Sequence, residues 1–300
     1  MEAAVRKQKI AVIGGANMDI SGSPRLPLNL HDSNPGSVRL RPGGVGRNVA
    51  RDLRLLGLEV TLITALGDDL FGAGLRQSCE EQGIDLSLAL CVPGARSSTY
   101  LYIADESGDM LSGIADMDIV AELTPERLAE RLEAIHRADA AVIDANLSAE
   151  AVACLAEKLR VPLYADPVSA AKAPRLLPLL PRLRAIKPNR LEAEKLTGES
   201  DPERAARALL TMGVRRVFLS LGAEGILAAE GERLLRLPCL PGPVVNTNGA
   251  GDAAVAAIVW AGLRGLDLEG CARAALSAAA QACASPETNP PTFTMKAGAS

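Results

Sequence analysis

The stretch Asn246-Thr247-Asn248-Gly249-Ala250-Gly251-Asp252 precedes a run of small apolar residues, 253–261, that contains neither Pro nor Gly. The run predicts a buried helix, so the glycine turn lies at the helix N-terminus. Backbone N–H groups and the positive end of the helix dipole would face an anion there. Asp252 then lies in the first turn as a candidate general base. An ordinary helix start with an acidic residue near its cap is the alternative.

The composition is that of a globular protein with a large core. The chain has 300 residues, 48% of them hydrophobic, and a net charge of −4, with a mean hydropathy of +0.14. This length predicts one large domain, or a domain with an appendage. Nucleic-acid binding needs a basic surface, so this acidic chain with 2% aromatic residues predicts no nucleic-acid partner. Apolar stretches are too short to span a bilayer, so we expect no membrane partner.

The cysteines and histidines show no spacing typical of a metal or redox site. None of the cysteines forms a C-x-x-C pair, which argues against zinc and dithiol chemistry. We interpret them as thiols in a reducing compartment and expect a cytoplasmic protein without a signal peptide. We interpret the two histidines, His31 and His136, as structural or solvated.

Strand and helix patterns alternate along the chain, which predicts an α/β fold with a mainly parallel sheet covered on both faces. The predicted strands are 10–13, 60–64, 140–143, 163–165, 185–187, 217–221 and 226–229. The predicted helices are 47–56, 71–82, 125–136, 149–158, 190–196, 203–212, 252–261 and 268–284.

Two segments interrupt this alternation. Residues 17–46 are rich in Ser, Pro, Gly and Asn, and residues 98–120 alternate like a hairpin with a turn at Glu106-Ser107-Gly108. We expect them to form a small β lid above the carboxyl ends of the sheet strands, where open α/β folds bind ligands. The α/β core would comprise residues 1–16, 47–97 and 121–300.

Two glycine-containing turns bring polar side chains to that edge. Asn17 and Asp19 follow the first predicted strand and are placed to hold sugar hydroxyls, although simple loop solvation is an alternative. Gly43 and Gly44 precede a predicted helix that carries Asn48, so the backbone can approach a ligand closely. A lone Gly-Gly is more often only a turn. Neither a dinucleotide fingerprint nor a P-loop occurs.

Taken together, these motifs resemble the PfkB family of carbohydrate kinases, also called the ribokinase-like family. The resemblance rests on 43–50, on Lys187-Pro188-Asn189-Arg190-Leu191-Glu192, on 220–225 and on 246–252, in that order along the chain. It implies a three-layer fold with a small β lid. It also implies phosphoryl transfer to a hydroxyl, with Asp252 as base and an anion hole at Gly249, Ala250 and Gly251.

The resemblance further implies the cofactors ATP and Mg²⁺, with Glu192 organising the magnesium. The residues that it places near the nucleotide are Lys172, Asn189, Ser220, Gly222, Gly225, Asn246 and Asn248. For Lys172 alone, a surface position is an equal alternative. Asn246 stands where the family usually has Asp, which leaves dependence on a monovalent cation such as K⁺ open.

Within the family, the details favour members that phosphorylate the ribose 5′-hydroxyl of pseudouridine. These details include Asn246, the segment 166–172, the lid run with Tyr100 and Asp116, and the late segment 285–290. The acceptor-binding residues would be Asn17, Asp19, Gly43, Gly44, Asn48, Tyr100 and Asp116. Another nucleoside or sugar acceptor, or a ligand sensor without catalysis, are the alternatives. We expect a homodimer formed through the lid.

Overall fold

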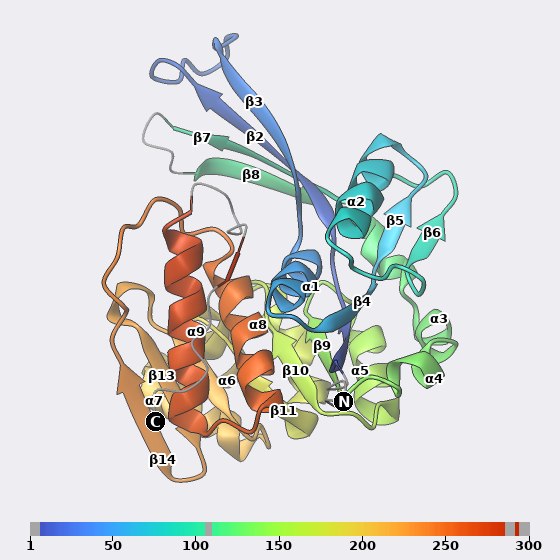
Figure 1. Ribbon diagram of the computed structural model, residues 1–300. Coiled ribbons are helices and arrows are strands. Elements are labelled where there is room, and N and C mark those ends of the chain that lie inside the picture. Colours follow the sequence, from blue (N-terminus) through green and yellow to red (C-terminus); the bar gives the residue numbers. More distant parts are fainter. Residues whose placement is uncertain (1–6, 106–109, 286–291, 294–300) are drawn as a thin grey trace, which may run out of the picture.

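The computed structural model, which describes residues 7–105, 110–285 and 292–293, is built around the buried strand β1 (Lys9–Ile13). An eight-stranded sheet contains it, in the order β14-β13-β12-β11-β10-β9-β1-β4 (Figure 1). All neighbours from β4 through β1 to β12 in this sheet order pair in parallel, whereas β13 and β14 pair antiparallel. The further bounds are β4 (Glu59–Ile63), β9 (Ala140–Asp144), β10 (Leu163–Asp166), β11 (Leu183–Ile186), β12 (Val217–Ser220), β13 (Ile226–Glu230) and β14 (Arg233–Leu237).

Helices cover both faces of this sheet because its strands are apolar on both faces. In β1, Ile10 and Val12 pack into one core, whereas Ala11 and Ile13 pack into the other. The first core is closed by α1 (Val45–Leu55), α8 (Ala250–Leu263) and α9 (Leu268–Cys283). The second is closed by α5 (Ala149–Lys158), α6 (Arg190–Thr197) and α7 (Pro202–Thr211), with the 3₁₀ helices η1 (Asp118–Glu122) and η2 (Ala173–Arg182). The predicted three-layer α/β fold is confirmed.

A second sheet of four strands projects from the end of the main sheet (Figure 1). Its order is β3 (Gly36–Gly43), β2 (Asn17–Pro24), β7 (Thr99–Ala104) and β8 (Met110–Asp116). Strands β7 and β8 form the predicted antiparallel pair, whereas the turn predicted at Glu106-Ser107-Gly108 and most of the segment 285–290 lie outside the described residues. All four strands fall within 17–46 and 98–120. Helix α2 (Leu70–Glu81) packs against this sheet through Leu75 and Met18.

Several elements differ from the sequence-based expectation. A parallel pair, β5 (Ala65–Gly67) and β6 (Leu90–Val92), and the edge strand β14 were not predicted. The helix expected over 125–136 is broken into α3 (Pro125–Ala129) and α4 (Leu132–Ile135). At the break the Arg131 guanidinium donates to the carbonyls of Leu88 and Arg127. Helix η2 was also missed, and its internal prolines, Pro178 and Pro181, are incompatible with a regular α-helix.

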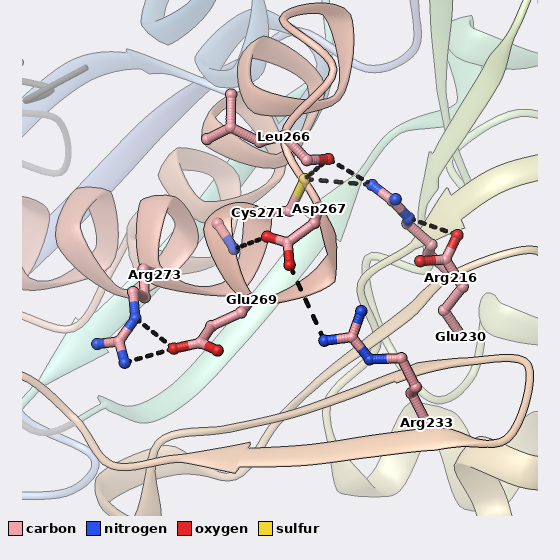
Figure 2. Close-up of polar contacts among 9 residues, drawn as sticks. Arg216, Glu230, Arg233, Leu266, Asp267, Glu269, Cys271 and Arg273 are labelled. Atoms are coloured by element: carbon pink, nitrogen blue, oxygen red, sulfur yellow. Dashed lines mark hydrogen bonds and ion pairs between the residues drawn. The ribbon is translucent and has the colours of Figure 1, made fainter. Parts of the chain in front are cut away.

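A buried arginine ties the helical layer to the sheet at the end opposite the small sheet. Arg216, just before β12, donates to the Leu266 carbonyl at 3.0 Å and to the Cys271 Sγ at 3.5 Å. Its Nε also lies 2.9 Å from a carboxylate oxygen of Glu230 (Figure 2). The contacts join β12, β13 and the α8–α9 connection, so Arg216 has a structural role.

Candidate active site

Two carboxylates end neighbouring strands of the main sheet. Asp144 ends β9 and Asp166 ends β10, and the parallel register places them side by side. Both are buried. Asp144 accepts hydrogen bonds from the backbone N–H groups of Gly15 and Asn146, each at 2.8 Å, and burial is the main cause of its raised pKa. The Nζ of Lys187, after β11, lies 3.9 Å from Asp166, so a buried cation offsets part of this negative charge.

Two helices point uncapped N-termini at this edge. The N-cap residues are Gly249 (φ 79°) for α8 and Gly44 (φ 95°) for α1, and neither makes a side-chain hydrogen bond. Side chains do cap α2, α5, α7 and α9, from Asp69, Ser148, Asp201 and Asp267. No side chain therefore caps the N-termini of α1 and α8, although the Arg47 N–H donates to the Gly15 carbonyl and the Ala250 N–H lies 3.4 Å from the Thr247 carbonyl. The other N–H groups at these helix starts can face a ligand.

The two helix starts meet through one hydrogen bond. Asn48 Nδ2 on α1 donates to Asp252 Oδ2 on α8 at 2.9 Å. Burial and the nearby Asp166 raise the pKa of Asp252 to about 7, although the Asn48 hydrogen bond and Lys187 act in the opposite direction. A carboxylate with a pKa near the working pH is suited to general base chemistry.

The predicted acceptor side is assembled from β2, β3 and β7. Asn17 Nδ2 donates to Asp19 Oδ1 at 2.6 Å, and a Cβ on Gly43 would overlap the Asp19 carboxylate. Tyr100 pairs with Asp19 in the register of β2 and β7. Burial raises the pKa of Asp19, and burial and Asp19 both raise that of Tyr100. These side chains share one face of the small sheet.

The predicted metal-side residues form a reciprocal cap on α6. Asn189 Oδ1 accepts from the Glu192 N–H at 2.9 Å, and Glu192 Oε2 accepts from the Asn189 N–H at 2.8 Å. Burial and the neighbouring Asp166 raise the pKa of Glu192, while Lys187 opposes the rise. Asn189 also bridges to Ser220, at the end of β12. One carboxylate oxygen of Glu192 is thus engaged by the cap.

The other predicted nucleotide-side residues lie on turns around this edge. Gly222 (φ 63°) and Gly225 (φ 98°) form the turn after β12. Asn246 Oδ1 accepts from the Asn248 N–H at 2.9 Å, and the Asn246 N–H donates to the Cys283 carbonyl. Lys172 Nζ donates to Asn146 Oδ1 at 2.6 Å.

One predicted residue faces away from this assembly. Asp116, at the end of β8, is 42% exposed at its side chain and lies 3.6 Å from the exposed Arg96 guanidinium. The residues that sequence reasoning did not assign to the site are Asp144, Asn146, Asp166 and Lys187. Each stands at or just after the carboxyl end of a predicted strand, and that position was the signal available for finding them.

The donor set suits a phosphate-bound magnesium ion rather than an all-protein metal cage. Among the described residues, no group of three or more His, Cys, Asp or Glu side chains is close enough to hold a metal. Mg²⁺ bound with a nucleotide needs only one or two carboxylates, together with phosphate oxygens and water. The buried Glu192 beside Asp166 meets that requirement.

The fold and the site together fit the class of small-molecule phosphotransferases, because the strand ends of an α/β sheet lie beside two helix N-termini and the buried carboxylate of Asp252. The chain belongs to the pfkB family carbohydrate kinases, whose model matches residues 7–295. The family implies a phosphotransferase for a small sugar or nucleoside, and its members use ATP, typically with Mg²⁺. In the described part of the chain, no helix has the length and apolar character of a membrane span.

Relatives cover nearly the whole chain. It is 37% identical to the pseudouridine kinase of Escherichia coli (strain K12) over 286 residues, 90% of this chain and 91% of that protein. It is 34% identical to an uncharacterized sugar kinase of the same organism, over 94% of this chain and 80% of that protein. The crystal structure of ribokinase from Thermotoga maritima superposes with a TM-score of 0.85 at 23% identity, covering 94% of each chain.

Proposed function

We propose that this protein transfers the γ-phosphoryl group of ATP to the ribose 5′-hydroxyl of pseudouridine, giving pseudouridine 5′-phosphate and ADP. The carrying observation is the Asn48–Asp252 hydrogen bond, because it joins the acceptor-side turn to the helix start expected to face the phosphate. The pseudouridine kinase at 37% identity supports this acceptor.

In the proposed reaction Asp252 takes the proton of the attacking hydroxyl. The N–H groups of the N-cap residue Gly249 and of Ala250 and Gly251 in the first turn of α8 would donate to the oxygens on which charge develops. Lys187 Nζ lies beside Gly251, since a Cβ built there would be 3.3 Å away, and adds positive charge at the same place. Bound magnesium would neutralise phosphate charge, and Glu192 is the residue that we assign to holding it.

The acceptor is proposed to lie between the two sheets. Asn17 and Asp19 would bind ribose hydroxyls, and Gly43 and Gly44 would let the backbone approach the sugar. Tyr100, on the same face of the small sheet as Asp19, would cover the nucleobase, whereas Asp116 on the opposite face is left out of the proposed site. The four-stranded sheet, within 17–46 and 98–120, would then act as a lid that excludes water.

On the donor side we propose that ATP lies along α6 and the turn after β12. Asn189, Ser220, Gly222 and Gly225 would line the nucleotide, with Asn246, Asn248 and Lys172 near its phosphates. Dependence on K⁺ is left open in this proposal, because Asn246 supplies an amide oxygen that already accepts a hydrogen bond from the Asn248 N–H. A cytoplasmic location is proposed too, and the free thiols of all six cysteines suit a reducing compartment.

We propose a homodimer formed through the outer face of the small sheet. The strand registers align Leu40, Leu101 and Ile114 on the face opposite Asp19, with Val38 and Ile103 two residues along. Each of these apolar side chains is at least 40% exposed, and a second copy would cover them. Sedimentation of the wild type and of Ile114→Arg tests this: a monomeric wild type would overturn it.

The alternatives are another nucleoside or sugar acceptor, and a sensor that binds without transfer. ADP release with ATP and Mg²⁺ distinguishes them when pseudouridine, uridine, adenosine, ribose and fructose 6-phosphate are compared, each with Asp252→Asn as control. Turnover on pseudouridine alone, lost in the control, is the expected result. Turnover on another acceptor would replace the substrate, and nucleoside binding without turnover would indicate a sensor.

A further inference from the structure

Arg47 is a buried cation next to the proposed acceptor site, with only 5% of its surface exposed. Its Nη1 donates to the Asn48 Oδ1 at 3.2 Å and to the Pro42 carbonyl at 3.1 Å. Its Nη2 donates to the Ser78 Oγ on α2 at 2.8 Å. One guanidinium therefore joins α1, the end of β3 and α2.

These contacts fix which way the Asn48 amide points. A guanidinium has only donors and an ionised carboxylate has only acceptors. Asn48 lies between one of each, with Arg47 on its carbonyl side and Asp252 on its amino side. An inverted amide would face a donor with its own donor and the carboxylate with its own acceptor, so both contacts would become repulsive.

We propose that Arg47 is a positioning residue for phosphoryl transfer. It fixes the Asn48 amide so that Asn48 Nδ2 holds Asp252 Oδ2, which leaves Asp252 Oδ1 to take the hydroxyl proton. The inference rests on the proposed function of Asp252 as base. Because the same guanidinium holds the Pro42 carbonyl at the end of β3, it also sets the position of the small sheet relative to the base.

The charged groups around these side chains come from several elements. Arg47 faces Asp19 on β2 and Cys79 on α2. On its own helix it faces Arg51 and Asp52. Burial lowers the pKa of the Arg47 guanidinium. Burial raises the pKa of the neighbouring Asp19 carboxylate, and the Asn17 hydrogen bond and the Arg47 charge offset part of that rise.

Asp252 is surrounded by other charged groups. Asp166 from β10 and Asp144 from β9 raise its pKa, and Lys187 lowers it. Asp52, one helical turn after Asn48, also interacts with it. The Asn48 donor stabilises the charged carboxylate, so losing the amide orientation is expected to raise the pKa of Asp252 further.

The test compares Arg47→Lys and Arg47→Ala with the same changes at Arg216, the buried arginine at the far end of the sheet (Figure 2). The Arg47→Lys variant would keep the charge, but an ammonium is a point donor and could not bond Asn48, Pro42 and Ser78 in one plane. We expect kcat to fall roughly tenfold to hundredfold in Arg47→Lys, with KM for ATP within about twofold. The acid limb of the kcat profile should move to higher pH.

The Arg216 variants control for stability alone. They should lower the melting temperature while the acid limb stays in place. A folded Arg47→Lys with wild-type kcat and an unmoved limb would overturn the inference, even if Arg47→Ala does not fold. Transfer by Asp252→Asn would instead overturn the proposed function, so the two failures are distinguishable.

Discussion

Lys187 Nζ lies 3.9 Å from Asp166 Oδ2, and less than a tenth of either side chain is exposed. This cation acts on more than its nearest partner, since it opposes the rise in pKa of both Asp252 and Glu192. It is the counter-charge for a row of carboxylates at one edge of the sheet.

Replacing that cation should change the pH dependence of the reaction. In Lys187→Met the pKa of Asp252 should rise above about 7, so the acid limb of kcat/KM moves to higher pH. Lys9→Met is the matched control, because Lys9 lies at a similar 3.8 Å from Glu59 but is more than half exposed. Steady-state rates from pH 5 to 9 measure both, and an unmoved limb in Lys187→Met would contradict the prediction.

Asp252→Asn should lose activity and gain stability. An amide cannot take the proton, so kcat should fall by about 10² to 10⁴ while ATP still binds. Since the pKa of Asp252 is raised from 3.8 to about 7 on folding, the cost of burying its charge is absent below pH 3.8 and complete above pH 7. Thermal melting should therefore show a larger stabilisation by the variant at pH 8 than at pH 5. Equal stabilisation at both pH values would argue against it.

Asp52 should be replaceable with a gain in stability. This carboxyl is completely buried, its Oδ2 has no hydrogen-bond partner in the described structure, and its Oδ1 lies 3.4 Å from the Arg51 guanidinium. Burial holds the pKa of Asp52 well above the usual range. The free-energy cost of burying this group therefore grows as pH rises. Asp52→Leu removes a buried polar group that lacks a full set of hydrogen bonds, and should raise the free energy of unfolding by about 1–3 kcal/mol at pH 8, measured by urea denaturation. A less stable variant would show that the carboxyl supports the fold.

Gly44→Ala should be far more damaging than Gly57→Ala, although both glycines have positive φ, 95° and 85°. A Cβ on Gly44 would lie 2.7 Å from Ala16 Cα and the Gly15 carbonyl oxygen, whereas Gly57 has open space. Gly57→Ala then costs only backbone strain, about 1 kcal/mol. Gly44→Ala should exceed about 3 kcal/mol and raise KM for the acceptor. Similar unfolding midpoints for the two variants would refute the steric argument.

Periodicity was enough to predict the central strands and the packed helices, because apolar runs between turn residues are local features. It failed at the edge strand β14, whose sequence Arg-Leu-Leu-Arg-Leu does not alternate with a period of two, and at η2, where proline forces a tighter helix. At the break between α3 and α4, Arg131 donates a hydrogen bond to the Leu88 carbonyl. These two residues are 43 positions apart, which is farther than a local sequence pattern reaches.

Sequence reasoning likewise found only the part of the candidate site that lies in local motifs. Asp252, Glu192 and Asn48 stood out because each belongs to a local motif with glycine or a helix start. Lys187 and Asp166 belong to the same site, but only the neighbouring positions of β10 and β11 bring them together. That adjacency comes from strand order, which local spacing does not specify.

The small sheet and α8 come from separate stretches of the chain. All four strands of the small sheet end by Asp116, whereas α8 begins at Ala250. In the proposed reaction, recognition of the acceptor and handling of phosphate are therefore encoded in different parts of the gene. Mutations in the first 116 codons would change which hydroxyl is presented, while the proposed transfer machinery of α8 is inherited unaltered.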